Sequence, residues 1–316
     1  MSNESPATST TTEDAATSSI SALAAGPLLS PEMLAKLETL DLLSRKVFQG
    51  RMKGERRSTR KGRSVEFADF RNYAQGDDLR FVDWNIFARL EKLFVKLFLE
   101  EEDLHFYVLI DNSPSMEFGE PTKLRAAKQI AAALSFIGLI RAHRVKIETL
   151  GQSLRRPGPV WRGRQNVWRM LDYLDGLAGN EKTSLLDGVK NFGLRNTGRG
   201  IALLISDLMD KQGYEAALRF LAARRMDTYV IHVLSREELK PDVSGDLRLI
   251  DSEDADATEI TMSETLLKAY DRTLQSFLAD VRDFCARRAL GYLFIDNQTP
   301  VERIVAETLR RQGLVG

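Results

Sequence analysis

The chain has little cysteine, little histidine and no long hydrophobic run. Its 316 residues include one cysteine, Cys285, and three histidines. A single cysteine excludes an intrachain disulfide and a cysteine-rich metal site, and it is compatible with a reducing compartment. The longest apolar stretch, residues 130–140, is too short to span a bilayer, which needs roughly 20 residues. The first 20 residues lack the basic start and apolar core of a signal peptide. We therefore expect a cytoplasmic protein.

The chain also lacks the signatures of common enzymes. It contains no G-x-x-x-x-G-K-[ST] phosphate loop and no G-x-S-x-G nucleophile elbow. His105, His143 and His232 are scattered, and two of them, His105 and His232, lie in strand-like runs where packing explains them. We assign no catalytic residue and no organic cofactor, and we expect no enzymatic activity.

Net charge is absent, but charge is unevenly distributed. Lysine plus arginine equals aspartate plus glutamate, 45 against 45, so the whole chain has no excess charge to attract a polyanion. Residues 45–63, however, hold nine basic side chains against one acid, Glu55. Such a run suits a solvated loop, docking onto an acidic protein surface, or nucleic-acid binding. Only Phe48 is present to stack on bases.

Composition divides the chain into three regions. Residues 1–28 are rich in Ser, Thr and Ala and are predicted to be a disordered tail. Residues 29–103 are predicted to form a helix starting at Ser30-Pro31, the basic segment, and a mixture of aromatic and charged residues with a strand over 93–99. We expect this second region to pack on the core, which residues 104–316 form.

From residue 104 onward, strand patterns alternate with helix patterns. Apolar runs predict buried strands over 107–110, 200–206 and 227–234, and further strands are predicted over 144–150 and 291–296. Helical periodicity predicts helices over 123–141, 165–177, 184–192, 214–224, 263–288 and 301–311, and a polar hairpin is predicted over 247–262. This alternation predicts an α/β fold with a mostly parallel, doubly wound, Rossmann-like sheet.

Oxygen-bearing side chains follow two of these strands. Asp111, Ser113 and Ser115 come directly after the first buried strand, and Asp207 directly follows the strand over 200–206. Thr183 precedes a predicted helix and supplies a further hydroxyl. Ligands bind at the carboxyl ends of strands in such sheets, and hard oxygen donors suit Mg²⁺ or Mn²⁺. The simpler alternatives are turn formation by Asp-Asn-Ser-Pro and helix capping by Thr183 and Asp207.

The D-x-S-x-S pattern of Asp111, Ser113 and Ser115, followed by Thr183 and Asp207, resembles the metal-ion-dependent adhesion site of von Willebrand factor A domains. The resemblance implies a von Willebrand A-type fold and a magnesium ion that contacts the hydroxyls directly and the two acids largely through water. It also implies an open position for an Asp or Glu of a protein partner. The sequence departs from the pattern before Thr183, where Glu181 and Lys182 replace the usual glycines.

A longer motif is more specific. The string R-x-Y-x-x-G-D-x-x-R-x-x-D-W runs from Arg71 to Trp84, within a region from Gly62 to Met116 that is similar to domain-of-unknown-function family 58, a bacterial von Willebrand A-like group. Members are commonly encoded beside MoxR-type AAA+ ATPases, which implies such a partner. The Arg71–Trp84 motif itself suits either a structural ion-pair network or a partner site.

The leading hypothesis is a metal-ion-dependent protein-interaction module that works with a MoxR-type AAA+ ATPase in chaperone-like or assembly work. One alternative is a Mg²⁺-dependent phosphohydrolase using Asp111 and Asp207, although Ser113 stands where its general acid is needed. The other is nucleic-acid binding through residues 45–63.

Overall fold

The computed structural model divides into two compact units, residues 1–43 with 105–316, and residues 44–104. The predicted second region is thus shared between them, because helix α2 (Pro31–Leu37) belongs to the larger unit. Residues 1–26 of the predicted tail lie outside the described residues, whereas Leu28 at its end is buried. The structure describes residues 27–42, 65–100, 104–150, 158–179, 184–224, 226–243, 245–250, 257–310 and 313–316.

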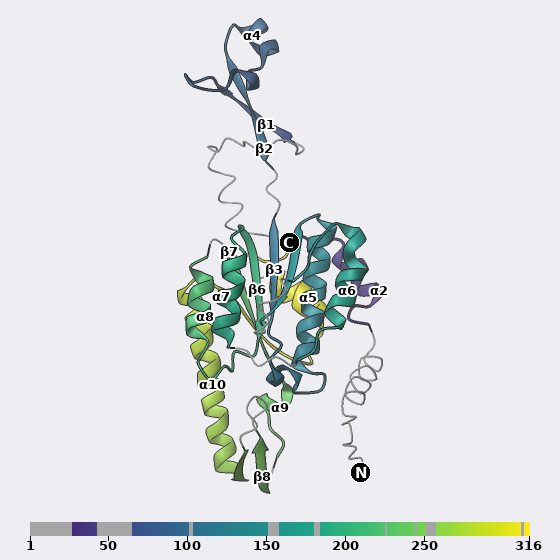
Figure 1. The fold of residues 1–316 in the computed structure, drawn as a ribbon, viewed down its shortest axis with the longest axis vertical. Helices are drawn as coiled ribbons and strands as arrows, with labels where there is room; N and C mark the ends of the chain where they lie inside the picture. Colours follow the sequence, from purple (N-terminus) through teal and green to yellow (C-terminus); the bar gives the residue numbers. More distant parts are fainter. Residues whose placement is uncertain are drawn as a thin grey trace, which may run out of the picture. The chain divides into compact units, whose positions relative to one another are not determined.

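The larger unit is built on a six-stranded sheet in the order β10-β7-β6-β3-β4-β5 (Figure 1). Its strands are β3 (His105–Ile110), β4 (Arg144–Thr149), β5 (Val160–Arg162), β6 (Gly200–Ser206), β7 (Met226–Leu234) and β10 (Gly291–Asp296). Every neighbouring pair is parallel except β4 and β5. The prediction of a mostly parallel α/β sheet is confirmed. The short antiparallel strand β5 was not predicted.

Helices cover both faces of this sheet (Figure 1). On one face, α7 (Leu185–Arg195), α8 (Glu215–Ala222) and α10 (Glu264–Arg287) share one hydrophobic core with β3 side chains such as Tyr107 and Leu109. On the other face, α5 (Lys123–Ile140) approaches closely, because Gly138 lies against Val145 and Phe106. Side chains of β3 point alternately to these two faces, and all of them from Phe106 to Ile110 are buried. Burial of both faces explains the continuous apolar run in the sequence.

The remaining elements of the larger unit follow the predictions with small shifts. Ser30 caps α2 by accepting a hydrogen bond from the Met33 amide at 3.1 Å, as its position before Pro31 predicts. The polar hairpin is confirmed as β8 (Gly245–Ile250) and β9 (Ala257–Met262). The helix predicted over 165–177 is η3 (Arg164–Asn166) followed by α6 (Val167–Asp175), whereas η2 (Pro114–Glu117) and α9 (Arg236–Leu239) were not predicted. The predicted last helix is a short α11 (Val301–Arg303) followed by a π-helical segment, η4 (Ile304–Leu309).

The smaller unit is an antiparallel hairpin of β1 (Val65–Asn72) and β2 (Phe94–Glu100), with η1 (Leu79–Phe81) and α4 (Trp84–Leu90) between the strands. The strand predicted over 93–99 is confirmed as β2. Strand β1 and helix α4 were not predicted.

The charged residues of the Arg71–Trp84 motif pair within this unit. The Arg71 guanidinium donates to both carboxylate oxygens of Asp77, each at 2.7 Å. Asp78 caps η1 and pairs with Arg80, and Asp83 caps α4 while pairing with Lys96. The motif's charges thus form an ion-pair and capping network inside the hairpin unit.

Among the described residues, no helix is long and apolar enough to cross a membrane.

Candidate metal centre

Sheet topology brings Asp111 and Asp207 to the same place. Strands β3 and β6 are parallel neighbours, with Ile110 paired to Ile205, and the Asp111 amide donates to the Ile205 carbonyl at 2.9 Å. The chain leaves β3 for β4 on one side and returns in β6 on the other, which makes this boundary the switch point of the sheet. The two carboxylates therefore lie at the position where α/β sheets bind ligands.

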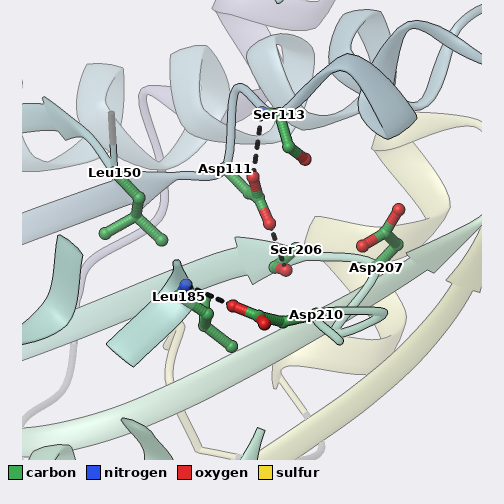
Figure 2. A pocket seen from close by; sticks show the side chains of 7 residues that line it. All are labelled: Asp111, Ser113, Leu150, Leu185, Ser206, Asp207 and Asp210. Atoms are coloured by element: carbon green, nitrogen blue, oxygen red, sulfur yellow. Dashed lines mark hydrogen bonds between the residues drawn. The ribbon is translucent and has the colours of Figure 1, made fainter. Parts of the chain in front are cut away.

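Asp111 is held by two donors (Figure 2). Its Oδ1 accepts from the Ser113 amide at 3.0 Å, and its Oδ2 accepts from the Ser206 hydroxyl at 2.6 Å. Burial raises the pKa of Asp111, and the nearby charge of Asp207 acts in the same direction, while these hydrogen bonds oppose the rise. Sequence reasoning missed Ser206 because it read this residue only as the end of a buried strand.

The two serines predicted as metal ligands lie together. The Ser113 and Ser115 hydroxyl oxygens are 2.9 Å apart; Ser113 is the N-cap residue of η2, and Ser115 lies within η2. Between them and Asp111, Asn112 is buried, and within the described part of the chain its Oδ1 has no hydrogen-bond partner. A buried oxygen without a protein partner is a place where an ordered water is expected.

Asp207 is paired with a buried lysine. Its Oδ2 accepts from the Lys123 ammonium at 2.8 Å, and its Oδ1 accepts from the Met209 amide at 3.1 Å. Burial by itself would raise the pKa of Asp207, but the Lys123 charge and hydrogen bond outweigh burial and hold the pKa below its usual value. Asp207 does not cap the next helix, because α8 begins only at Glu215.

Sequence reasoning also missed Lys123, although the sequence carries a signal for it. Lys123 is the first residue of α5, an otherwise largely apolar helix, and a cation is unfavourable near a helix N-terminus. A buried lysine at that position is therefore expected to pair with carboxylates.

Thr183, the fifth predicted ligand, lies outside the described residues. The helix that follows it, α7, is hydrogen-bonded at its start to the loop after β6. The Leu185 amide at the start of α7 donates to Asp210 at 2.6 Å, whereas Ser184 makes no side-chain capping bond (Figure 2). Asp210, from the loop after β6, thus accepts a hydrogen bond from the first amide of α7.

A small cavity lies between the two acids and the start of α7 (Figure 2). Its lining residues are Asp111, Ser113, Leu150, Leu185, Ser206, Asp207 and Asp210. Over the described ranges, no three or more His, Cys, Asp or Glu side chains are grouped to hold a metal ion. A cation here would depend on hydroxyls, carboxylates and water. Such a donor set fits Mg²⁺, which keeps several waters and prefers oxygen, better than it fits zinc.

Residues 69–276 match the family described as "Protein of unknown function DUF58". The chain belongs to the DUF58 family. The matched region contains both Asp111 and Asp207, and the resemblance to domain-of-unknown-function family 58 is confirmed.

Curated relatives of this DUF58 protein include uncharacterized proteins from Mycobacterium tuberculosis (Rv1480, strain H37Rv) and Mycobacterium bovis (Mb1516). Each is 27% identical to the chain over 266 residues, which is 81% of the chain and 82% of the relative.

Solved structures similar to this DUF58 protein include the conserved hypothetical protein BatB from Bacteroides thetaiotaomicron, with 12% identity and a TM-score of 0.39. Another is an aerotolerance-related membrane protein from Bacteroides fragilis, with 11% identity and a TM-score of 0.38. The matches cover 66% of this chain and 98% and 99% of those chains, respectively.

Proposed function

We propose that this DUF58 protein is a metal-ion-dependent protein-interaction module with a von Willebrand A-type centre. The observation that carries the proposal is the meeting of Asp111, Asp207 and the Ser113–Ser115 hydroxyl pair at the carboxyl ends of β3 and β6. Two buried carboxylates, the buried Ser113 hydroxyl and the half-buried Ser115 hydroxyl offer hard oxygen and a negative potential, which together attract a small divalent cation.

The proposed ion is Mg²⁺ (or Mn²⁺). Ser113, Ser115 and Thr183 would hold it through hydroxyls, and Asp111 and Asp207 largely through water. Asp207 already shares its charge with Lys123, and Asp111 accepts two hydrogen bonds, so neither carboxylate is a free strong ligand. An ion held by few direct charges remains electrophilic and can accept an Asp or Glu from a protein partner.

The proposed partner is a MoxR-type AAA+ ATPase, in chaperone-like or assembly work. Support for this part comes from family membership and the sequence resemblance. The basic residues 45–63, which lie outside the described residues, would assist docking on an acidic surface. A cytoplasmic location is part of the same proposal. Ser113 argues against the phosphohydrolase alternative, because it stands two positions after Asp111 where an acid would be needed.

The experiment is capture of the organism's own MoxR-type ATPase by the purified full chain. Three arms are compared: wild type with Mg²⁺, wild type with EDTA, and Asp111→Ala with Mg²⁺. Asp172→Ala, an exposed acid of α6, serves as the matched control. We expect capture only by wild type and the control with Mg²⁺. Equal capture in all arms would remove the metal from the mechanism, and no capture in any arm would remove the ATPase.

A further inference from the structure

Lys123 carries a buried positive charge in the larger unit. Its side chain is completely buried, and its ammonium lies 2.8 Å from Asp207 and 2.5 Å from Glu238. These acids come from different elements: Asp207 follows β6, and Glu238 belongs to α9 after β7. A buried ammonium is costly unless it is paired and hydrogen-bonded, and here two carboxylates provide the compensation.

Glu238 connects this lysine to the start of α9. One carboxylate oxygen of Glu238 accepts from Lys123, and the other accepts from the Ser235 amide at 2.7 Å. The Ser235 hydroxyl in turn accepts from the Glu238 amide at 3.1 Å, which completes a capping box. The cap fixes the Glu238 carboxylate, so Lys123 is held between two anchored acids.

Lys123 lies next to the candidate metal centre. It stands at the positive end of α5, where the helix itself disfavours a cation, yet one of its two partners is an acid of the candidate metal centre. Three carboxylates, Asp111, Asp207 and Asp210, line the cavity, and the Lys123 ammonium pairs with Asp207. The lysine thus lowers the negative charge that a divalent cation would meet.

We infer that Lys123 is the resident cation of this site, which holds Asp207 in place and, together with Glu238, sets the affinity for the divalent ion. The inference rests on the proposed metal-binding function and deepens it. It makes Lys123 and Glu238 positioning residues of opposite effect: the ammonium repels the incoming ion, and the Glu238 carboxylate attracts it.

The test is calorimetric titration of Mg²⁺ into the full chain and into Lys123→Gln, Glu238→Gln and the double variant. Lys123→Gln should bind Mg²⁺ more tightly by about tenfold, because a charge repelling the ion within a buried site has been removed. Glu238→Gln should bind several-fold more weakly, and the double variant should fall between the two. Lys268→Gln, which breaks only an exposed ion pair with Glu264 on α10, should bind like wild type.

Changes of Mg²⁺ affinity in opposite directions in Lys123→Gln and Glu238→Gln distinguish an electrostatic role from a merely structural one. Weaker binding in both single variants, or unchanged affinity in Lys123→Gln while wild type binds, would overturn this inference and leave the metal proposal standing. Binding by Lys123→Gln but not by wild type would support the inference and overturn the proposed function. Binding by neither would overturn both. If Lys123→Gln does not fold, as judged by its thermal unfolding, Glu238→Gln decides: weaker binding supports the inference, and equal or tighter binding overturns it.

Discussion

The Ser206 hydroxyl donates a hydrogen bond to the Asp111 carboxylate at 2.6 Å across the neighbouring strands β6 and β3. The same hydroxyl accepts from the Leu208 amide at 2.9 Å, so its proton is directed at Asp111. Asp111 is thereby fixed from the strand that also carries Asp207.

Replacing Ser206 by Ala should destabilise the fold. The substitution leaves a buried carboxylate without one donor and the Leu208 amide without its acceptor, which should cost about 1–3 kcal/mol in the free energy of unfolding. Urea denaturation measures this difference. Ser135→Ala is the matched control, because Ser135 is equally buried and its hydroxyl has no partner among the described residues. Equal losses in the two variants would show that the Ser206–Asp111 bond contributes nothing specific.

Mg²⁺ binding should weaken as pH falls, and it should release protons at pH values near the raised pKa of Asp111. Burial raises the pKa of Asp111, so the metal-free site keeps its proton to a higher pH than an ordinary carboxyl does. A cation must displace that proton, and affinity is therefore lost as pH falls through the raised pKa. Titration in two buffers that differ in ionisation enthalpy measures the released protons. Identical heats in both buffers at every pH, together with an affinity that does not change with pH, would contradict the prediction.

Acid should weaken the fold through His232. Burial lowers the pKa of this histidine from 6.5 to about 4, and its Nδ1 lies 3.0 Å from the Tyr292 hydroxyl. Because the unfolded chain takes up the proton first, the stabilisation is complete above about pH 6.5 and is lost as pH falls toward 4. The loss amounts to roughly 3 kcal/mol for this shift.

The comparison that isolates His232 is wild type against His232→Gln, which retains hydrogen-bonding capacity toward Tyr292. Free energies of unfolding measured at several pH values should fall less steeply for the variant between pH 6.5 and 4. Parallel curves would assign the acid sensitivity to other groups.

Gly188→Ala should push α7 away from the end of β4. A Cβ on Gly188 would lie 2.6 Å from the Leu150 carbonyl oxygen, and backbone cannot yield as a flexible side chain does. The expected loss is about 1–3 kcal/mol in the free energy of unfolding. Gly176→Ala is the control, because a Cβ there meets its nearest atom only at 3.5 Å. Thermal unfolding of both variants checks the prediction, and a tolerated Gly188→Ala would contradict the close approach.

The sequence predicted most of the sheet and the meeting of Asp111 with Asp207, because buried parallel strands have continuous apolar runs and their carboxyl ends share one edge. It missed β1, where a register shift between Phe67 and Asp69 interrupts the two-residue alternation that reveals a strand. It also missed β5, which has only three residues.

The partners of the two acids were harder to predict than the acids themselves. Lys123 and Glu238 lie 115 positions apart, and their contact depends on how α5 and α9 pack at the sheet edge. Ser206 and Asp210 act through strand order and loop geometry, which local sequence patterns do not encode. The sequence therefore predicted which hydroxyl and carboxylate groups gather at the site. The ion pairs that set the net charge there were visible only in the structure.

Calorimetric titration of Mg²⁺ into wild type and Asp111→Ala tests the metal centre most directly. Wild type should bind one ion per chain, and Asp111→Ala, checked for folding by thermal unfolding, should show no binding under the same conditions. Absence of binding to wild type, or equal affinity in the folded Asp111→Ala variant, would contradict a metal site at the ends of β3 and β6.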